Sequence, residues 1–161
     1  MAKQNRLAIE NAKIGFRNFS GKEGKFNPAG RRNFCVFLNP KDADMLQEDG
    51  WNIKTLKPRD ESEDPVPYLK VSVNFDNVPP QVIMITRNGK TRLDEDSVDI
   101  LDWAEIENVD VIITPYTWEV NGNSGIKAYL KSIYVTLVED EFESKYANVP
   151  DSAANSMPID D

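Results

Sequence analysis

The sequence contains no histidine among its 161 residues and only one cysteine. Without histidine, the chain cannot build a Ser-His or Cys-His catalytic pair, an imidazole zinc site, or the proton carrier best suited to neutral pH. The single cysteine, Cys35, excludes an internal disulfide and a four-cysteine zinc site. It stands between Phe34 and Val36, which indicates a packed thiol rather than a nucleophile. A reducing cytoplasm is the expected compartment.

Long apolar runs are also missing. No stretch approaches the ~20 residues needed to span a bilayer, and the charged segment 1–6 has no apolar core behind it, so no signal peptide is expected. A hydrophobic content of 40% with fifteen aromatics nevertheless argues against wholesale disorder. One domain with a real core is therefore expected, and the chain is too short to make two probable.

Charge is sorted along the chain. The formal net charge is -8 at pH 7, yet residues 1–35 hold eight Lys or Arg against two Asp or Glu. Residues 93–161 show the reverse, with three basic residues against sixteen acidic ones. A basic front segment beside an acidic end indicates a body that binds a polyanion, together with a competing or partner-seeking tail.

Alternation of apolar and polar residues predicts a chain dominated by strands. Residues 7–16 follow period two with one slip, which predicts a single long bulged strand with Phe16 in the core. Asn88-Gly89 predicts a two-residue hairpin between strands at 82–86 and 91–93. Further strands are expected at 34–38, 51–56, 69–75, 109–120 and 126–138, with a turn at 121–125 and helices at 40–46 and 94–106.

This order predicts a mainly β fold, an OB-like five-stranded Greek-key barrel with one or two short helices. The barrel would occupy residues 1–140 and bind nucleic acid. From Glu139 onward apolar periodicity gives way to acidic residues and prolines. Residues 141–161 are therefore predicted to form a disordered, acidic C-terminal tail.

Segment 17–32 mixes cations, phenylalanines and glycines. This composition suits single-stranded nucleic acid, because cations meet phosphates and aromatic faces stack on bases. The alternative is a solvated loop whose phenylalanines dip into the core; exposed Phe beside Lys or Arg favours binding. The candidate residues are Arg17, Phe19, Lys22, Lys25, Phe26, Arg31 and Arg32.

A second candidate surface lies on the later strands. Period two places Lys127, Tyr129 and Lys131 on one face, which would make a stacking platform between phosphate contacts. The alternative is cross-strand pairing that only stabilises the sheet, and for Trp118 the two interpretations are equally supported. The other candidates are Lys54, Lys57, Tyr68, Lys70, Tyr116 and Trp118.

Two further functions compete with strand binding. The carboxylates between Asp94 and Glu105 could hold Mg²⁺ in a metal-dependent nuclease, although acidic residues near a helix N-terminus are favoured by the helix dipole anyway. An acidic protein could instead mimic DNA and block a host enzyme, which the overall charge favours and the basic front segment opposes. Incubation of labelled DNA with Mg²⁺ or Mn²⁺ separates the nuclease from the other two.

The later half of the sequence resembles the closing strands of the T7-type phage single-stranded-DNA-binding proteins. The most specific part is the Pro-Tyr-x-Trp element at 115–118, followed after a glycine-containing turn by the strand at 125–133. A weaker likeness runs upstream in the same order, through the Phe-Asn-Pro-x-Gly loop at 26–30, the strand at 34–38 and the Gly89-Lys90 hairpin. The likeness thus covers about the whole body.

The resemblance implies an OB-fold and sequence-tolerant binding of single-stranded DNA in phage replication or recombination, within the infected cell's cytoplasm. It implies no catalysis, no cofactor and, as is common among such proteins, a homodimer. It also implies an acidic tail that contacts replication proteins, here through Asp151, Ile159, Asp160 and Asp161. The tail of the family's proteins is longer, richer in acidic residues and ends in an aromatic residue. This chain therefore differs from the family in its tail and not in its strand-binding face.

Overall fold

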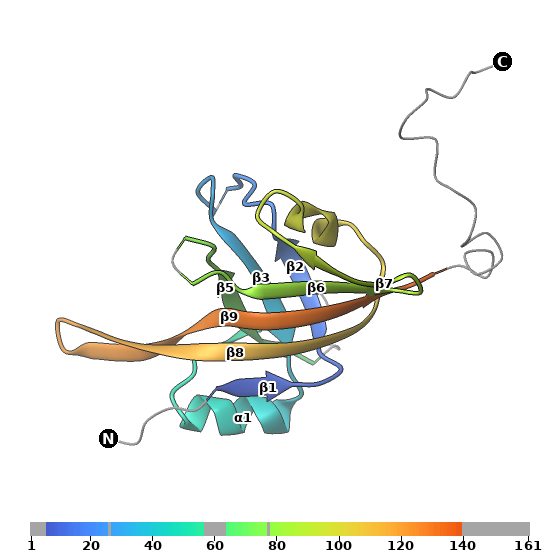
Figure 1. The fold of residues 1–161 in the computed structure, drawn as a ribbon. Coiled ribbons are helices and arrows are strands. Elements are labelled where there is room, and N and C mark those ends of the chain that lie inside the picture. The colour runs from blue at the N-terminus through green and yellow to red at the C-terminus, as the bar shows by residue number, and fades with distance from the viewer. Residues whose placement is uncertain (1–5, 26, 57–63, 77, 140–161) are drawn as a thin grey trace, which may run out of the picture.

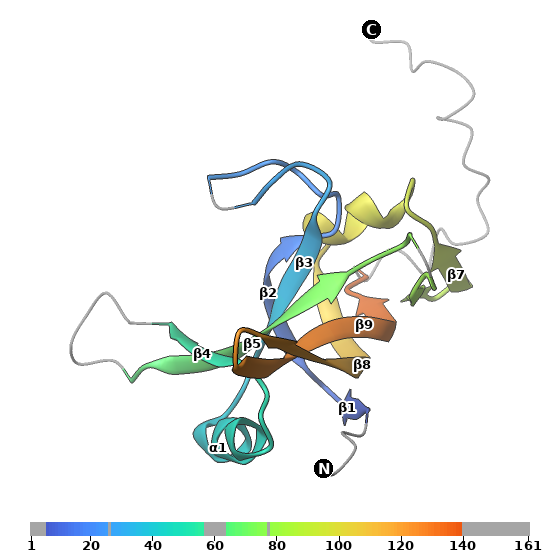
Figure 2. The ribbon, with the colours of Figure 1, turned by 90° about the vertical axis from the view of Figure 1, so that its left-hand side faces the viewer.

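One continuous curled sheet carries the fold in the computed structural model, which describes residues 6–25, 27–56, 64–76 and 78–139 (Figures 1 and 2). The predicted tail at 141–161 lies outside the described residues. The elements in chain order are β1 (Leu7–Ile9), β2 (Lys13–Asn18), β3 (Arg32–Phe37), α1 (Pro40–Glu48), β4 (Ile53–Leu56), β5 (Val66–Val73), β6 (Gln81–Thr86), β7 (Gly89–Leu93), the 3-10 helix η1 (Val98–Asp102), β8 (Ile106–Val120) and β9 (Asn123–Leu137).

The two longest strands, β8 and β9, organise the sheet. The strand order is β1-β8-β9-β5-β3-β2, with β4 added to β5 and the β6–β7 hairpin added to β9. β9 runs parallel to β5 at Ala128 and Tyr129 and then parallel to β6 from Ser132 onward. The β8–β9 register shifts between Ile112 and Ile113, close to where β9 changes neighbour. Such an irregularity bends the pair, and β2 and β3 consequently run steeply across β8 and β9 (Figure 1).

The core lies inside this curl. Phe34, Leu69 and Ile113 are fully buried on the inner faces of their strands, and Leu101 of η1 covers the core from the end. None of the described helices is long and apolar enough to cross a membrane. The mainly β class is confirmed, and the sheet holds nine described strands instead of the five expected, because short edge strands and the β6–β7 hairpin extend it.

The N-terminal strand prediction differs most from the structure. Residues 7–16 form two strands on different neighbours, since β1 pairs with β8 and β2 pairs with β3. The true bulge lies between Gly15 and Asn18, where Phe16 has a positive φ of 47°. An extra residue inverts the alternation beyond it. The prediction that Phe16 lies in the core was therefore wrong: its side chain is 59% exposed, and Phe19 is fully buried instead.

The turns and the first helix follow their local signals. Asn39 accepts a hydrogen bond from the Asp42 amide at 2.8 Å and caps α1, with Pro40 in its first turn. Gly89 has a φ of 119° in the expected β6–β7 turn. The predicted helix at 94–106 is shorter than expected, because β8 already begins at Ile106 and the Asp94 carboxylate accepts from the Ser97 amide in a preceding turn.

Candidate nucleic-acid interface

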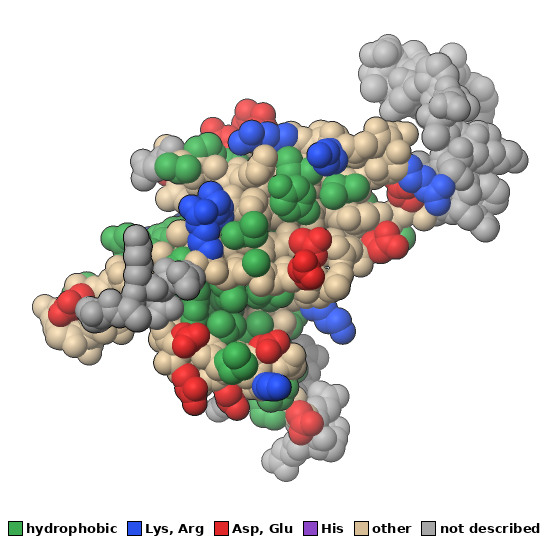
Figure 3. All heavy atoms as spheres, turned by 60° about the horizontal axis from the view of Figure 1, so that its bottom comes forward, with side chains coloured by type: hydrophobic (Ala, Val, Ile, Leu, Met, Phe, Trp, Pro, Cys, Tyr) green, Lys and Arg blue, Asp and Glu red, His purple; other side chains and the backbone are tan. Residues whose placement is uncertain are grey.

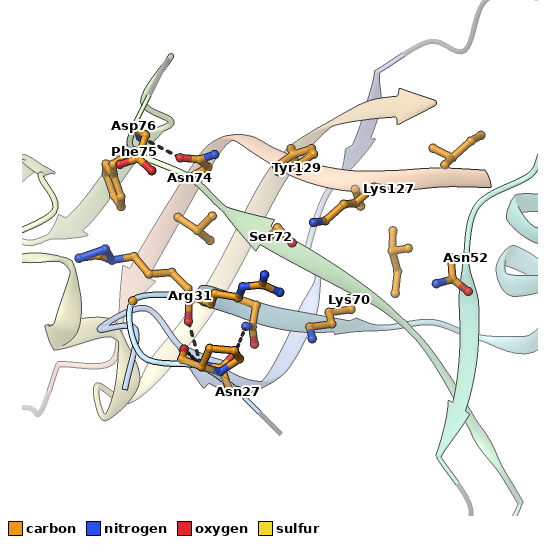
Figure 4. Close-up of a pocket in the computed structure, with 18 of the residues that line it drawn as sticks. Asn27, Arg31, Asn52, Lys70, Ser72, Asn74, Phe75, Asp76, Lys127 and Tyr129 are labelled. Carbon is orange, nitrogen blue, oxygen red and sulfur yellow. Dashed lines mark hydrogen bonds between the residues drawn. The ribbon is translucent and has the colours of Figure 1, made fainter. Parts of the chain in front are cut away.

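A groove of about 470 Å³ crosses the outer face of β5 and β9 and is bordered by the loop before β3 (Figure 4). Figure 4 shows Lys70 of β5 and Lys127 of β9 extending around one opening, with Tyr129 at its edge. The charged and aromatic residues that line the groove are Arg31, Arg32, Lys54, Lys70, Phe75, Asp76, Glu95, Trp118, Lys127 and Tyr129.

Positive charge prevails in the groove despite the acidic chain. Five of the lining residues are Lys or Arg and two are acidic. Among the described residues, Lys54, Lys70 and Lys127 make no ion pair with a carboxylate. All three side chains are exposed. Their charge is therefore available to an anion such as a phosphate backbone.

Aromatic rings lie between these cations. The Lys127 ammonium stands 5.1 Å from the centroid of the Tyr129 ring, and the ring of Tyr116 meets Tyr129 edge-on at 6.0 Å. Tyr129 is half-buried, whereas Tyr116 is exposed. Register explains the cluster, because Tyr116 pairs directly with Lys127 across β8 and β9, and Thr114 pairs with Tyr129. Base–aromatic stacking needs an accessible ring held in place by such neighbours.

Trp118 is held by a glycine on the neighbouring strand. It pairs with Gly125, and a Cβ added at Gly125 would lie 2.9 Å from the indole ring. The ring can therefore lie flat over β9 only because this residue has no side chain. Trp118 remains 39% exposed and lines the groove. Packing and binding, the two interpretations of this tryptophan, are compatible in this geometry.

Asparagines and a backbone contact position the arginine side of the groove. Asn27 Nδ2 donates to the Arg31 carbonyl at 3.0 Å, and Asn33 Nδ2 donates to Asn27 Oδ1 at 2.9 Å. Arg32 Nε donates to the Phe19 carbonyl at 2.9 Å, while its guanidinium lies 5.3 Å from the centroid of the Phe75 ring. The loop before β3 is thus tied to the body.

The structure brings together seven of the residues predicted from sequence. Arg31, Arg32, Lys54, Lys70, Trp118, Lys127 and Tyr129 line the groove, and Tyr116 adjoins Tyr129. The groove lining does not include the other described candidates, which are Arg17, Phe19, Lys22, Lys25, Tyr68 and Lys131. Six of the predicted residues lie outside the described residues: Phe26, Lys57, Asp151, Ile159, Asp160 and Asp161.

Two of the predicted contact residues make contacts within the protein instead of lining the groove. Phe19 is fully buried and stacks on Phe34 with ring centroids 5.1 Å apart, so its face is unavailable to a base. Arg17 Nη1 donates to the carbonyls of Leu101 and Ala104 at 3.0 and 2.8 Å, which ties β2 to η1. Arg17 lies within the β2 bulge and points toward η1, whereas Phe19 follows the bulge and points into the core.

The carboxylates between Asp94 and Glu105 do not converge on a metal site. Asp102 accepts hydrogen bonds from the amides of Phe19 and Ser20, and Asp94 accepts from the Ser97 hydroxyl. This last hydrogen bond is the main reason that the pKa of Asp94 is lowered. Within the described ranges, no group of three potential metal ligands is placed to hold an ion.

Cys35 lies beneath the lysines of the groove. Burial raises the pKa of its thiol, an effect that nearby Lys70 and Lys54 partly offset. The thiol therefore stays protonated and packed at neutral pH, as its neighbours in the sequence indicated.

Uncharged groove residues were missed by the sequence analysis. Asn52, Ser72 and Asn74 line the groove beside the lysines. Ser72 and Asn74 share the outward parity of Lys70, which was the available signal. The acidic residues of α1 lie elsewhere: Figure 3 shows acidic side chains gathered over this helix, which carries Asp42, Asp44 and Glu48.

Comparison with known proteins identifies similar phage proteins. A family model described as "Putative phage ssDNA-binding domain" matches residues 1–161. No curated protein gives a significant match. The single-stranded DNA-binding protein from bacteriophage Enc34 in complex with ssDNA is similar with 13% identity and a TM-score of 0.55, over 85% of this chain and 89% of that chain.

A second structure of the Enc34 protein has 11% identity and a TM-score of 0.53, over 93% of this chain and 89% of that chain. The gp2.5 single-stranded DNA-binding protein of bacteriophage T7 has 12% identity over 97% of this chain and 99% of that chain, with a TM-score of 0.38. The Enc34 structures confirm the OB-like fold.

Proposed function

This chain belongs to the phage ssDNA-binding domain family, and from that premise we propose that it binds single-stranded DNA in the groove across β5 and β9 with little sequence preference. The protein would protect single strands during phage DNA replication or recombination in the infected cell's cytoplasm, without catalysing a reaction. The observation that carries this proposal is the combination of five cations with the rings of Tyr129 and Trp118 in one groove.

The proposed mechanism follows from the kinds of groups in the groove. Lysine and arginine neutralise phosphates and release counterions, which makes binding strong at low salt. Tyr129 and Trp118 offer faces on which any base can stack, so sequence matters little. Asn52, Ser72 and Asn74 can donate to phosphate or sugar oxygens, and contacts of that kind position a strand without reading its bases.

The first test is titration of the full chain with a poly-dT oligonucleotide and with a duplex of equal length, at several salt concentrations. We expect much tighter binding of the single strand, with each neutralised phosphate contributing about 0.7 to the logarithmic salt slope. Tryptophan fluorescence reports binding, and Trp118→Phe should remove most of the signal because Trp51 is buried and Trp103 does not line the groove. Equal affinity for duplex and single strand would refute the proposal.

A further inference from the structure

Three aromatic rings form a cluster on the outer face of the sheet beside the groove. Phe16, at the β2 bulge, contacts Phe37 of β3 with ring centroids 6.0 Å apart and Tyr68 of β5 with ring centroids 6.3 Å apart. Phe16 is 59% exposed, and the other two rings are half-buried. A large exposed apolar ring supported by two others is typical of a binding surface rather than of a solvated strand edge.

The backbone is shaped to present this cluster. Phe16 has a φ of 47°, a backbone conformation that is unfavourable for a bulky side chain. Gly15 precedes it, and a Cβ there would lie 2.5 Å from the ring of Phe37. The absent side chain of Gly15 thus admits the Phe37 ring, and the strained Phe16 places a third ring against it.

Two lysines lie beside the rings of the cluster. Lys13 pairs directly opposite Phe37, and Lys54 pairs opposite Tyr68, so these lysines share the face of the rings. Strands β2, β3, β4 and β5 contain no acidic residue. Neither Lys13 nor Lys54 forms an ion pair within the described part of the chain. The charge of these lysines therefore favours an anionic partner such as a phosphate backbone.

The cluster is also continuous with the groove. Lys54 and Lys70 line the groove, and Tyr68 is the register partner of the first and stands two residues from the second. On its other side Phe16 borders a surface hollow that it shares with Trp103, which is 72% exposed. The charged residues that line this hollow are Arg17, Lys22, Glu23, Asp99 and Asp102. A phosphate backbone that leaves the groove can thus reach Phe16 from the side of Lys54 and Tyr68, whereas the carboxylates Asp99 and Asp102 on the other side of Phe16 repel a phosphate.

We propose that Phe16, Phe37 and Tyr68 form a second base-stacking site, onto which single-stranded DNA continues after it leaves the groove. This inference rests on the proposed function and extends the interface across β3 to β2. A strand that is long enough would then occupy both stacking sites, and a short one only the groove.

The test compares short and long dT oligonucleotides on the full-length chain. In the wild type, affinity should rise with length until both sites are filled. Phe16→Gly removes the ring at a position whose positive φ glycine tolerates, so the fold should persist, as a thermal melt would verify. We expect this variant to bind the long oligonucleotide at least about five-fold more weakly and the short one unchanged. Phe16→Tyr should restore the affinity.

Trp103→Ala is the matched control, because it removes an exposed aromatic that makes no ring contact with Phe16, Phe37 or Tyr68, and it should change neither affinity. If the wild type binds no oligonucleotide, the proposed function itself fails. If it binds but Phe16→Gly matches it at both lengths, the second stacking site is refuted. Sedimentation provides a second check. If Phe16→Gly dissociates a dimer and leaves the DNA affinity of each protomer unchanged, the cluster contacts a second copy of the chain, and the stacking site is refuted.

Discussion

Tyr129 lies where the cations and rings of the groove meet, with the Lys127 ammonium 5.1 Å from its ring centroid and Tyr116 edge-on to it. If a base stacks on this ring, Tyr129→Ala should weaken single-strand binding by about 1–3 kcal/mol. Tyr129→Phe keeps the ring and should bind nearly as the wild type does. Titration with poly-dT measures both variants. A drop in melting temperature of Tyr129→Ala that accounts for the lost binding would instead make the ring structural.

At the scale of single residues, the sequence predicted the residues that line the groove better than it predicted the side-chain directions around the β2 bulge. Lys70, Lys127 and Tyr129 have the outward parity that the groove requires, and parity within a regular strand is a local property. Phe16 and Phe19 exchanged their expected places because the shift between Gly15 and Asn18 depends on the partner strand β3. No local pattern in segment 15–18 shows which residue is the extra one.

At the level of elements, β2 and η1 are joined by two reciprocal contacts. Asp102 accepts from the amides of Phe19 and Ser20, and Arg17 donates to the carbonyls of Leu101 and Ala104. Charge-assisted hydrogen bonds to half-buried groups are among the stronger ones. The acidic and basic residues that looked like separate functional candidates therefore stabilise one corner of the fold.

We expect Asp102→Asn to lower the free energy of unfolding by about 1–3 kcal/mol, because two backbone amides lose a charged acceptor. Denaturant unfolding measures the loss. Asp99→Asn on the same turn is the matched control, since the Asp99 side chain is exposed, and it should leave stability nearly unchanged. Single-strand affinity of folded Asp102→Asn should equal that of the wild type; cleavage or loss of binding traced to Asp102 alone would contradict the structural role.

The start of a helix or the position of a turn was predictable where a short local sequence determines it. Asn88-Gly89 and the Asn39-Pro40 start of α1 each determine a turn or a cap by their own chemistry. The division of residues 7–16 between β8 and β3 was not predictable, because it depends on which strands lie alongside. The helix expected at 94–106 failed for a similar reason: pairing of β8 with β9 begins at Ile106 and leaves only η1.

Across the whole molecule, the sorting of charge along the chain corresponds only partly to the sorting in space. The groove draws its cations from the basic front segment and from β4, β5 and β9, while α1 is acidic. Glu139, where the apolar periodicity of the sequence ends, forms an ion pair with Arg87 at 2.8 Å and belongs to the body. Any segment that competes for the groove must therefore begin beyond it.

Residues 140–161, which lie outside the described residues, carry six Asp or Glu against one Lys. Tethering to the body raises the effective concentration of this anionic segment near the groove to around the millimolar range, so even weak attraction should compete with DNA. Salt screens that attraction. Deleting residues 144–161 should therefore tighten poly-dT binding at low salt, with a gain that shrinks as salt rises, and leave the melting temperature unchanged.

The matched control for this deletion keeps the length and removes the charge, by replacing Asp151, Asp160 and Asp161 with Asn. It should reproduce much of the gain if electrostatic competition is the cause, and none of it if the segment acts by bulk alone. A truncated protein that binds poly-dT no better than the full chain at low salt would show that the segment is a spacer. One that melts at a lower temperature would place the domain boundary beyond residue 143, because residues 144–161 would then contribute contacts to the folded body.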